Sequence, residues 1–199
     1  MKYLKLISLL FVTMLGGLFA SCEETAEIDE YANWQERNEA FIDSIAKVAE
    51  ANTDGKWKKI LSFKLDSIDI QGNPIEHDAN DYIYCHIEQN GEGDVHPLYT
   101  DFVSVNYRGR LIPTISQPKG LVFDESYRGE FNPLFNTSRN FYVDDLIVGW
   151  STALMNMVKG DHWHVYIPAN LGYGSQKKED IPAHSTLIFD LNLVNFSAE

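Results

Sequence analysis

Hydrophobic and polar residues alternate along most of the chain after Trp57, and strict alternation is the pattern of half-buried β-strands. In "HWHVYIP", for instance, Trp163, Val165 and Ile167 would point to one face and the residues between them to the other. Turn-forming clusters such as "QGNP" separate the alternating stretches. These stretches predict an antiparallel sheet with strands within 57–70, 81–90, 101–111, 162–168 and 185–196.

Helical spacing precedes this β-rich region. The stretch "NWQERNEAFIDSIAKVAEANTDG" places Trp34, Phe41, Ile45 and Val48 on one face, and the turn formers from Asn52 onward end the helix. An isolated helix of this length is marginal in water. We therefore expect its apolar face to pack on the following domain, although binding to a partner protein is an alternative.

A second, shorter helix is expected within "DLIVGWSTALMNMVKGD", residues 145–161. Trp150, Ala153, Leu154 and Met157 have helical spacing, and Lys159 with Gly160 would close the helix. The large indole of Trp150 therefore lies where a β-like run gives way to a helix. It either fills the core or forms the floor of a binding site. One late helix against a face of the sheet predicts the α+β fold class.

The N-terminus has the pattern of a targeting segment. Lys2 and Lys5 precede an apolar stretch, and "LFASC" resembles the bacterial lipobox, in which the cysteine (here Cys22) is acylated and becomes the first residue. A plain secretory signal is the alternative. The acidic "CEETAE" that follows resembles the export signal of surface lipoproteins in Bacteroidetes-type bacteria. The expected organisation is a signal peptide at 1–21, an acidic tether at 22–31, a helix at 32–55 and a domain at 57–199.

These features place the protein at the cell envelope, anchored by a lipid in the outer membrane on its periplasmic or surface side. The net charge of −13 argues against nucleic acid as a partner, because phosphate binding needs clustered Lys and Arg. Only Cys85 remains once Cys22 is acylated, so no intramolecular disulfide is expected. Cys85 lies in a strand-like run, and we expect it to be buried.

No motif for nucleophilic, phosphate-binding or zinc-dependent catalysis is present. His162 and His164 share a strand face and could bind a metal, but the sequence offers no third ligand, so two solvated histidines are the simpler interpretation. We therefore expect no metal and no cofactor. The remaining candidates are aromatic residues, which form either core or a concave apolar site: Tyr107, Phe123, Phe141, Trp150, Tyr173 and Phe189.

The motifs "VSVNYRGRL", "FDES", "LIVGW", "MVKGDHWHVYIPANLGYG" and "IPAHSTLIFDLNLV" occur in this order. Together they resemble the FK506-binding (FKBP) type of peptidyl-prolyl cis-trans isomerase, over roughly residues 82–196. The resemblance implies an antiparallel sheet of about five to six strands wrapped around a short helix, preceded here by the N-terminal helix. It also implies that Trp150 is the floor of a proline pocket, and that the chain acts on proline-containing polypeptides as a monomer.

The resemblance further assigns the site residues. Trp150 would seat the pyrrolidine ring, the Tyr173 hydroxyl would hold a substrate carbonyl, and Asp124 would orient the rim through a hydrogen bond to Tyr107. The catalytic set it implies is Tyr107, Asp124, Trp150, Tyr173 and Phe189. The substrate-binding set it implies is Phe123, Phe141, Leu146, Ile147 and Ile181.

Two segments, 112–122 and 125–140, are longer than the family's usual connections. We expect them to lie at the pocket mouth, where Phe131, Leu134 and Phe135 would extend the apolar rim. The alternative is that these side chains pack locally and hold the insertion closed.

The expected activity is isomerisation of Xaa-Pro bonds, which requires no nucleophile because only the rotation barrier has to fall. A non-catalytic proline-peptide binding or chaperone module is the main alternative. A structural scaffold with a blocked pocket is a third.

Overall fold

The computed structural model describes residues 29–132 and 135–197. The expected signal peptide, Cys22 and most of the acidic tether lie outside these residues. Within them, no helix is both long enough and apolar enough to cross a membrane.

The described chain forms a seven-stranded antiparallel sheet with the order β1-β2-β6-β7-β3-β4, in which β5 also pairs with β3. Two short strands share one edge of β3: β5 lies along its first half and β4 along its second half. The strands are β1 (Trp57–Leu61), β2 (Tyr82–Gln89), β3 (Phe102–Arg110), β4 (Val122–Glu125), β5 (Arg139–Tyr142), β6 (His162–Ile167) and β7 (Leu187–Ser197). The α+β class is confirmed. The sheet has two strands more than the five that alternation predicted, because β4 and β5 are four-residue strands outside the alternating stretches.

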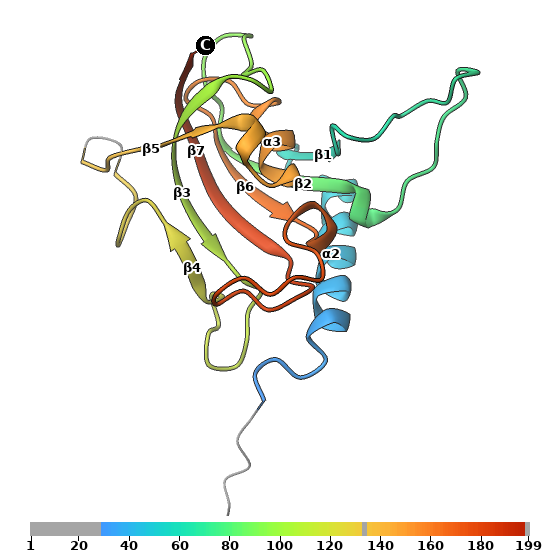
Figure 1. Ribbon diagram of the computed structural model, residues 1–199, viewed down its shortest axis with the longest axis vertical. Coiled ribbons are helices and arrows are strands. Elements are labelled where there is room, and N and C mark those ends of the chain that lie inside the picture. The colour runs from blue at the N-terminus through green and yellow to red at the C-terminus, as the bar shows by residue number, and fades with distance from the viewer. Residues whose placement is uncertain (1–28, 133–134, 198–199) are drawn as a thin grey trace, which may run out of the picture.

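The helices lie on opposite faces of the sheet. The sheet curves around α3 (Val148–Leu154), whereas α2 (Trp34–Ala51) runs along the outside at the β1–β2 end (Figure 1). Three short 3₁₀ helices complete the structure: η1 (Ala79–Asp81), η2 (Val143–Asp145) and η3 (Ala169–Leu171).

The inner face of the sheet forms the main core, as the alternation predicted. Trp163, Val165 and Ile167 of β6 are buried together with α3, and alternate residues of β3 and β7 join them. Gly149 permits the close approach of α3 to the sheet, because a Cβ there would lie 2.4 Å from Cγ2 of Ile167.

Helix α2 packs on the outer face, which confirms that it packs on the domain. The buried face differs from the expected one, however: Val48 is 48% exposed, and Phe41 and Ile45 are only half-buried. The buried residues are Trp34, Asn38, Ile42, Ala46 and Ala49. Small side chains let the helix approach Tyr84, and the Asn38 side-chain oxygen accepts a hydrogen bond of 2.7 Å from the Thr186 backbone N–H. These tertiary contacts rotate the helix relative to the position that its apolar stripe suggested.

Two elements end earlier than the sequence indicated. The strand expected at 57–70 ends at Leu61, and the chain from 62 to 78 projects from the body as a loop (Figure 1). Helix α3 ends at Leu154 and not at Lys159 and Gly160. The backbone then turns through a hydrogen bond of 3.1 Å from the Met157 N–H to the Leu154 carbonyl, which keeps Met157 in the core.

Candidate active site

A cavity of about 530 Å³ opens between α3, the β3–β4–β5 edge and the segment around residues 173–181. All the residues that the sequence assigned to catalysis or substrate binding line this cavity. They are Tyr107, Phe123, Asp124, Phe141, Leu146, Ile147, Trp150, Tyr173, Ile181 and Phe189. The structure thus brings the two sets together, while their individual roles stay predictions.

Trp150 lies at the centre of the aromatic lining. Its ring centroid is 5.0 Å from that of Tyr107, 5.0 Å from that of Phe189 and 6.0 Å from that of Phe141, each at an edge-to-face angle above 80°. Edge-to-face contacts are the favoured geometry of aromatic pairs, so the four rings hold one another in place. Trp150 is only 4% exposed, which is consistent with the floor of a cavity.

The position of Trp150 depends on how α3 begins. Ile147 precedes the helix, and its carbonyl accepts a hydrogen bond of 2.9 Å from the Trp150 backbone N–H. The Ser151 hydroxyl donates to the Val143 carbonyl at 2.8 Å and ties the helix to the preceding 3₁₀ turn. Leu146 and Ile147, between these two elements, are thereby directed to the cavity wall.

A polar network closes one side of the cavity. The Tyr107 hydroxyl donates a hydrogen bond of 2.6 Å to Oδ2 of Asp124, as the resemblance implied. Nη1 of Arg139 donates to the Tyr107 hydroxyl at 3.0 Å and to Oδ1 of Asp124 at 3.3 Å. Burial and the adjacent Asp124 carboxylate raise the pKa of Tyr107, although Arg139 opposes the shift. The hydroxyl therefore stays protonated and remains a donor.

Sequence reasoning missed Arg139. It lies on the four-residue β5 at the end of a long insertion, and no motif marks it. Pairing of β5 with β3 brings it to the Tyr107 side of the site.

Phe123 and Phe189 form a second aromatic wall, with ring centroids 5.6 Å apart and planes at 87°. Gly109 pairs with Phe189 across the sheet and lies against both rings. A Cβ on Gly109 would be 2.6 Å from Phe123 and 2.6 Å from Phe189, so only glycine leaves room for this wall.

The opposite rim is formed by Tyr173 and the turn at 178–181. The backbones of Lys178 and Ile181 exchange two hydrogen bonds, of 2.9 and 2.6 Å, and Ile181 is buried against the cavity. Burial, with the charges of Asp124 and Glu179, raises the pKa of Tyr173. No described residue accepts a hydrogen bond from the Tyr173 hydroxyl, so this donor is available to a ligand. Sequence reasoning also missed four charged residues that line the cavity, Asp145, Lys178, Glu179 and Asp180.

The expectation that the two insertions extend the apolar rim is wrong for the residues that the structure describes. No described residue of 112–122 or 125–138 lines the cavity. Phe131 instead contacts Tyr127 and His162, with centroids 5.1 and 6.2 Å apart, on the outer face of the sheet. Phe135 is 82% exposed, and Leu134 lies outside the described residues. The physical reason is that Arg108 donates hydrogen bonds to the carbonyls of Tyr127 and Gly129, which draws the insertion away from the cavity.

The first insertion also turns away from the cavity. The backbone N–H of Ser116 donates to the Glu30 carboxylate at 3.1 Å, and Arg37 of α2 donates to the Pro113 carbonyl at 3.3 Å. A separate depression of about 440 Å³, which shares Phe123 and Asp124 with the cavity, is lined by Val122, Arg139 and residues 125–128.

Comparisons with known proteins identify the family of this chain. The family model of FKBP-type peptidyl-prolyl cis-trans isomerases matches residues 93–194. The isomerase FkpA of Buchnera aphidicola subsp. Schizaphis graminum is 37% identical over 183 residues, which are 90% of this chain and 64% of that protein. FkpA of Escherichia coli K12 is 39% identical over 110 residues, which are 55% of this chain and 36% of that protein.

The crystal structure of FkpA from Escherichia coli superposes with a TM-score of 0.57 at 27% identity, covering 84% of this chain and 62% of that one. The chain thus spans between about a third and two thirds of the length of the curated relatives cited. The chain has an antiparallel sheet curved around α3, an aromatic cavity floored by Trp150 and a family match that covers half of its length. It therefore belongs to the FKBP-type peptidyl-prolyl cis-trans isomerases.

Proposed function

We propose that this chain isomerises Xaa-Pro bonds of extracytoplasmic polypeptides, and that the aromatic cavity is its substrate site. The observation that carries the proposal is Trp150, a buried ring at the base of a cavity of about 530 Å³ with Tyr107, Phe141 and Phe189 around it. A proline ring is compact and apolar, and such a cavity suits it.

The chemistry needs no nucleophile and no proton transfer. Rotation about the peptide bond has a barrier of about 18–20 kcal/mol, because planarity carries the amide resonance. The planar amide is more charge-separated than the twisted one, so an apolar site that removes water from the amide favours the twisted transition state. Trp150 seats the pyrrolidine ring, and Phe189 and Tyr107 flank it.

Polar groups at the rim orient the substrate. The Tyr173 hydroxyl, a protonated donor with no acceptor among the described residues, donates to a substrate carbonyl. Asp124 and Arg139 hold the Tyr107 ring in position through its hydroxyl. The donor and the ring positions are therefore set before the substrate arrives, which lowers the ordering cost of binding.

A non-catalytic proline-peptide binding or chaperone module is the second candidate. The long segments 112–122 and 125–140 favour it, because they depart from the family's usual connections while the cavity lining is retained. A module of this kind would bind proline peptides in the cavity without accelerating their isomerisation.

The test measures cis–trans exchange of a short Xaa-Pro peptide by NMR, with the chain beginning at Glu23. We expect exchange to accelerate with protein concentration, and Trp150→Leu to remove the acceleration while the chain stays folded. Peptide binding with unchanged exchange rates at saturation would instead support the binding module.

The same proposal places the protein at the cell envelope, held by a lipid on Cys22, as a monomer. The support for the lipid anchor is the lipobox-like "LFASC" and the acidic residues after it. Mass spectrometry of the membrane fraction should show a chain that begins at acylated Cys22. If a Cys22→Ser variant still fractionated with the membrane, the lipid anchor on Cys22 would be contradicted.

A further inference from the structure

Three neighbouring strands bring ionisable side chains into one row on the outer face of the sheet. His86 of β2 pairs with His164 of β6, and His164 pairs with Asp190 of β7. Paired residues place their side chains on the same face of a sheet, and here that face is opposite the one that carries Trp163, Val165 and Phe189. The row therefore lies on the other side of the sheet from the aromatic cavity.

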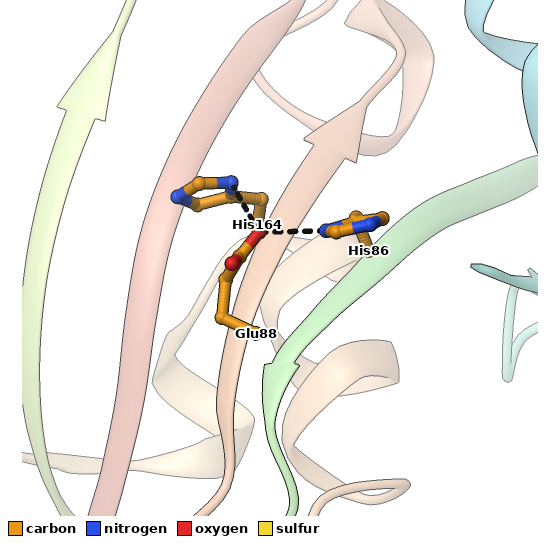
Figure 2. Close-up of side chains that lie close together, drawn as sticks. All are labelled: His86, Glu88 and His164. Carbon is orange, nitrogen blue, oxygen red and sulfur yellow. Dashed lines mark hydrogen bonds and ion pairs between the residues drawn. The ribbon is translucent and has the colours of Figure 1, made fainter. Parts of the chain in front are cut away.

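Glu88 completes the cluster. It follows His86 by two residues on the same face and lies at an irregularity of the β2–β6 register between Ile87 and Gln89. Its Oε1 is 2.6 Å from Nδ1 of His86 and 3.2 Å from Nδ1 of His164, so one carboxylate lies between two imidazoles (Figure 2). The potential ligand atoms of these three residues all lie within 4.8 Å of one another.

This spacing is close to what a transition-metal ion requires. Zn²⁺ binds imidazole nitrogen and carboxylate oxygen at about 2.0–2.2 Å, so ligand atoms of a tetrahedral site are roughly 3.3–3.5 Å apart. The Glu88–His164 separation of 3.2 Å is close to this spacing, and the Glu88–His86 separation of 2.6 Å would have to lengthen when an ion binds. Two histidines and one glutamate form a ligand set that zinc uses in proteins, with a further position open to water.

The outer contacts of the two histidines strengthen the assignment. Nε2 of His86 is 2.8 Å from Oδ2 of Asp54, and Nε2 of His164 is 3.7 Å from Oδ1 of Asp190. Histidine ligands characteristically direct their other ring nitrogen to a carboxylate, which fixes the tautomer and the ring orientation. Both histidines thus present Nδ1 to Glu88 and Nε2 to an acidic neighbour.

A second triplet, His162–His164–Asp190, competes for His164. Asp190 already accepts a hydrogen bond of 2.8 Å from the Tyr127 hydroxyl and also contacts His162. The ring of Phe131 lies beside His162, with centroids 6.2 Å apart. Because the Tyr127 hydroxyl, which is not a metal ligand in either triplet, already occupies Oδ2 of Asp190, we assign this carboxylate to orienting His164.

We propose that His86, Glu88 and His164 bind a divalent transition-metal ion of the Zn²⁺ class, with both imidazoles coordinating through Nδ1. The imidazole ligands favour such an ion over Mg²⁺ or Ca²⁺, which prefer oxygen ligands alone. The sequence indicated His162 and His164 as possible ligands but no third. In the sheet, Glu88 of β2 is the third ligand, and His86 of β2 takes the place of His162. The bound ion would link β2 to β6 and stabilise the fold.

Calorimetry with ZnCl₂ tests the proposal on the untagged full-length chain, with Cys22→Ser in every sample so that this thiol cannot bind the ion. We expect one ion per chain. Three ligand variants should each weaken Zn²⁺ binding more than about tenfold: His86→Gln, Glu88→Gln and His164→Gln. Asp54→Asn keeps all three ligands and should weaken Zn²⁺ binding by about tenfold. His77→Gln, a histidine outside the cluster, is the matched control and should bind as the parent does. Zn²⁺ should raise the unfolding temperature of the parent but not that of Glu88→Gln.

Three outcomes would overturn the assignment. One is the absence of saturable binding at millimolar Zn²⁺. Another is binding that persists in both His86→Gln and Glu88→Gln. The third is loss of binding in His162→Gln while His86→Gln still binds, which would move the ion to the competing triplet. Unfolding temperatures measured in EDTA establish that each variant is folded. Because the assignment is tested by several single-residue variants, one poorly folded variant does not decide the result.

Discussion

The Tyr107 hydroxyl donates a hydrogen bond of 2.6 Å to the Asp124 carboxylate, across two strands that meet at the rim of the aromatic cavity. Tyr107 also contacts the Trp150 ring edge-to-face. One side chain therefore connects the polar rim to the apolar floor, and the site acts as a unit.

Replacing Tyr107 with Phe tests this connection. The ring stays, but Asp124 loses a donor, and a hydrogen bond to a charged group contributes about 1.5–3 kcal/mol. We expect kcat/KM for an Xaa-Pro tetrapeptide to fall about tenfold in exchange-NMR measurements. Tyr142→Phe, at an exposed position of β5, is the control and should keep the parental value. Equal values for the two variants would show that the hydroxyl does not support the site.

Gly109→Ala tests the second wall. The added Cβ would overlap both Phe123 and Phe189 at 2.6 Å, so at least one ring must move. Overpacking of this kind costs about 1–3 kcal/mol, and we expect a lower free energy of unfolding together with weaker binding of proline peptides. Denaturant titration and peptide titration measure the two effects. Asn195→Ala, at an exposed position of the neighbouring strand β7, should change neither. Unchanged peptide affinity in Gly109→Ala would refute the close-packing argument.

The Cys85 thiol should be inert in the folded protein. Cys85 is fully buried, and burial raises the pKa of its thiol far above the usual range, which suppresses the reactive thiolate. In a chain that begins at Glu23 it is the only cysteine. We expect modification by a chromogenic disulfide reagent to be at least about a hundredfold slower in native buffer than in denaturant. Rapid labelling without denaturant would mean that the β1–β2 region opens locally.

Stability should fall at alkaline pH. Burial, with weaker contributions from nearby acidic groups, raises the pKa of Tyr84 to about 12, and the pKa values of Tyr107 and Tyr127 are raised as well. Between pH 10 and 12 the unfolded chain releases these protons while the folded chain retains them. The stabilisation is therefore complete below pH 10 and is lost as the pH rises through 12.

Tyr84→Phe isolates one of these contributions. For Tyr84 the stabilisation is roughly 2–3 kcal/mol, since one pKa unit corresponds to about 1.4 kcal/mol. Denaturant unfolding at pH 8, 10 and 12 should show the decrease, and Tyr84→Phe should show a smaller one. At pH 8 that variant should be less stable by about 1 kcal/mol, because Tyr84 donates to the Ala79 carbonyl. An identical pH dependence in the variant would exclude Tyr84 as a source.

The sequence by itself determined those features that depend on local pattern. Alternation identified β2, β3, β6 and β7 and correctly placed Trp163, Val165 and Ile167 in the core, because a strand assigns every second side chain to one face. The family resemblance carried by the ordered motifs selected ten residues that line the cavity, but it missed Arg139 and the charged residues of the lining. The 3.6-residue spacing identified α2 as a helix, but it did not identify which of its faces is buried.

Only the tertiary structure decided what depends on pairing between distant segments. Arg139 reaches Tyr107 because β5 and β4 share one edge of β3, and the insertion between them leaves the cavity because Arg108 binds its backbone. His86 meets His164 because β2 pairs with β6, although 78 positions separate them in the sequence. Residue spacing along the chain specifies the face of a strand but not its neighbour, since strand pairing arises from contacts that form only when the whole sheet assembles.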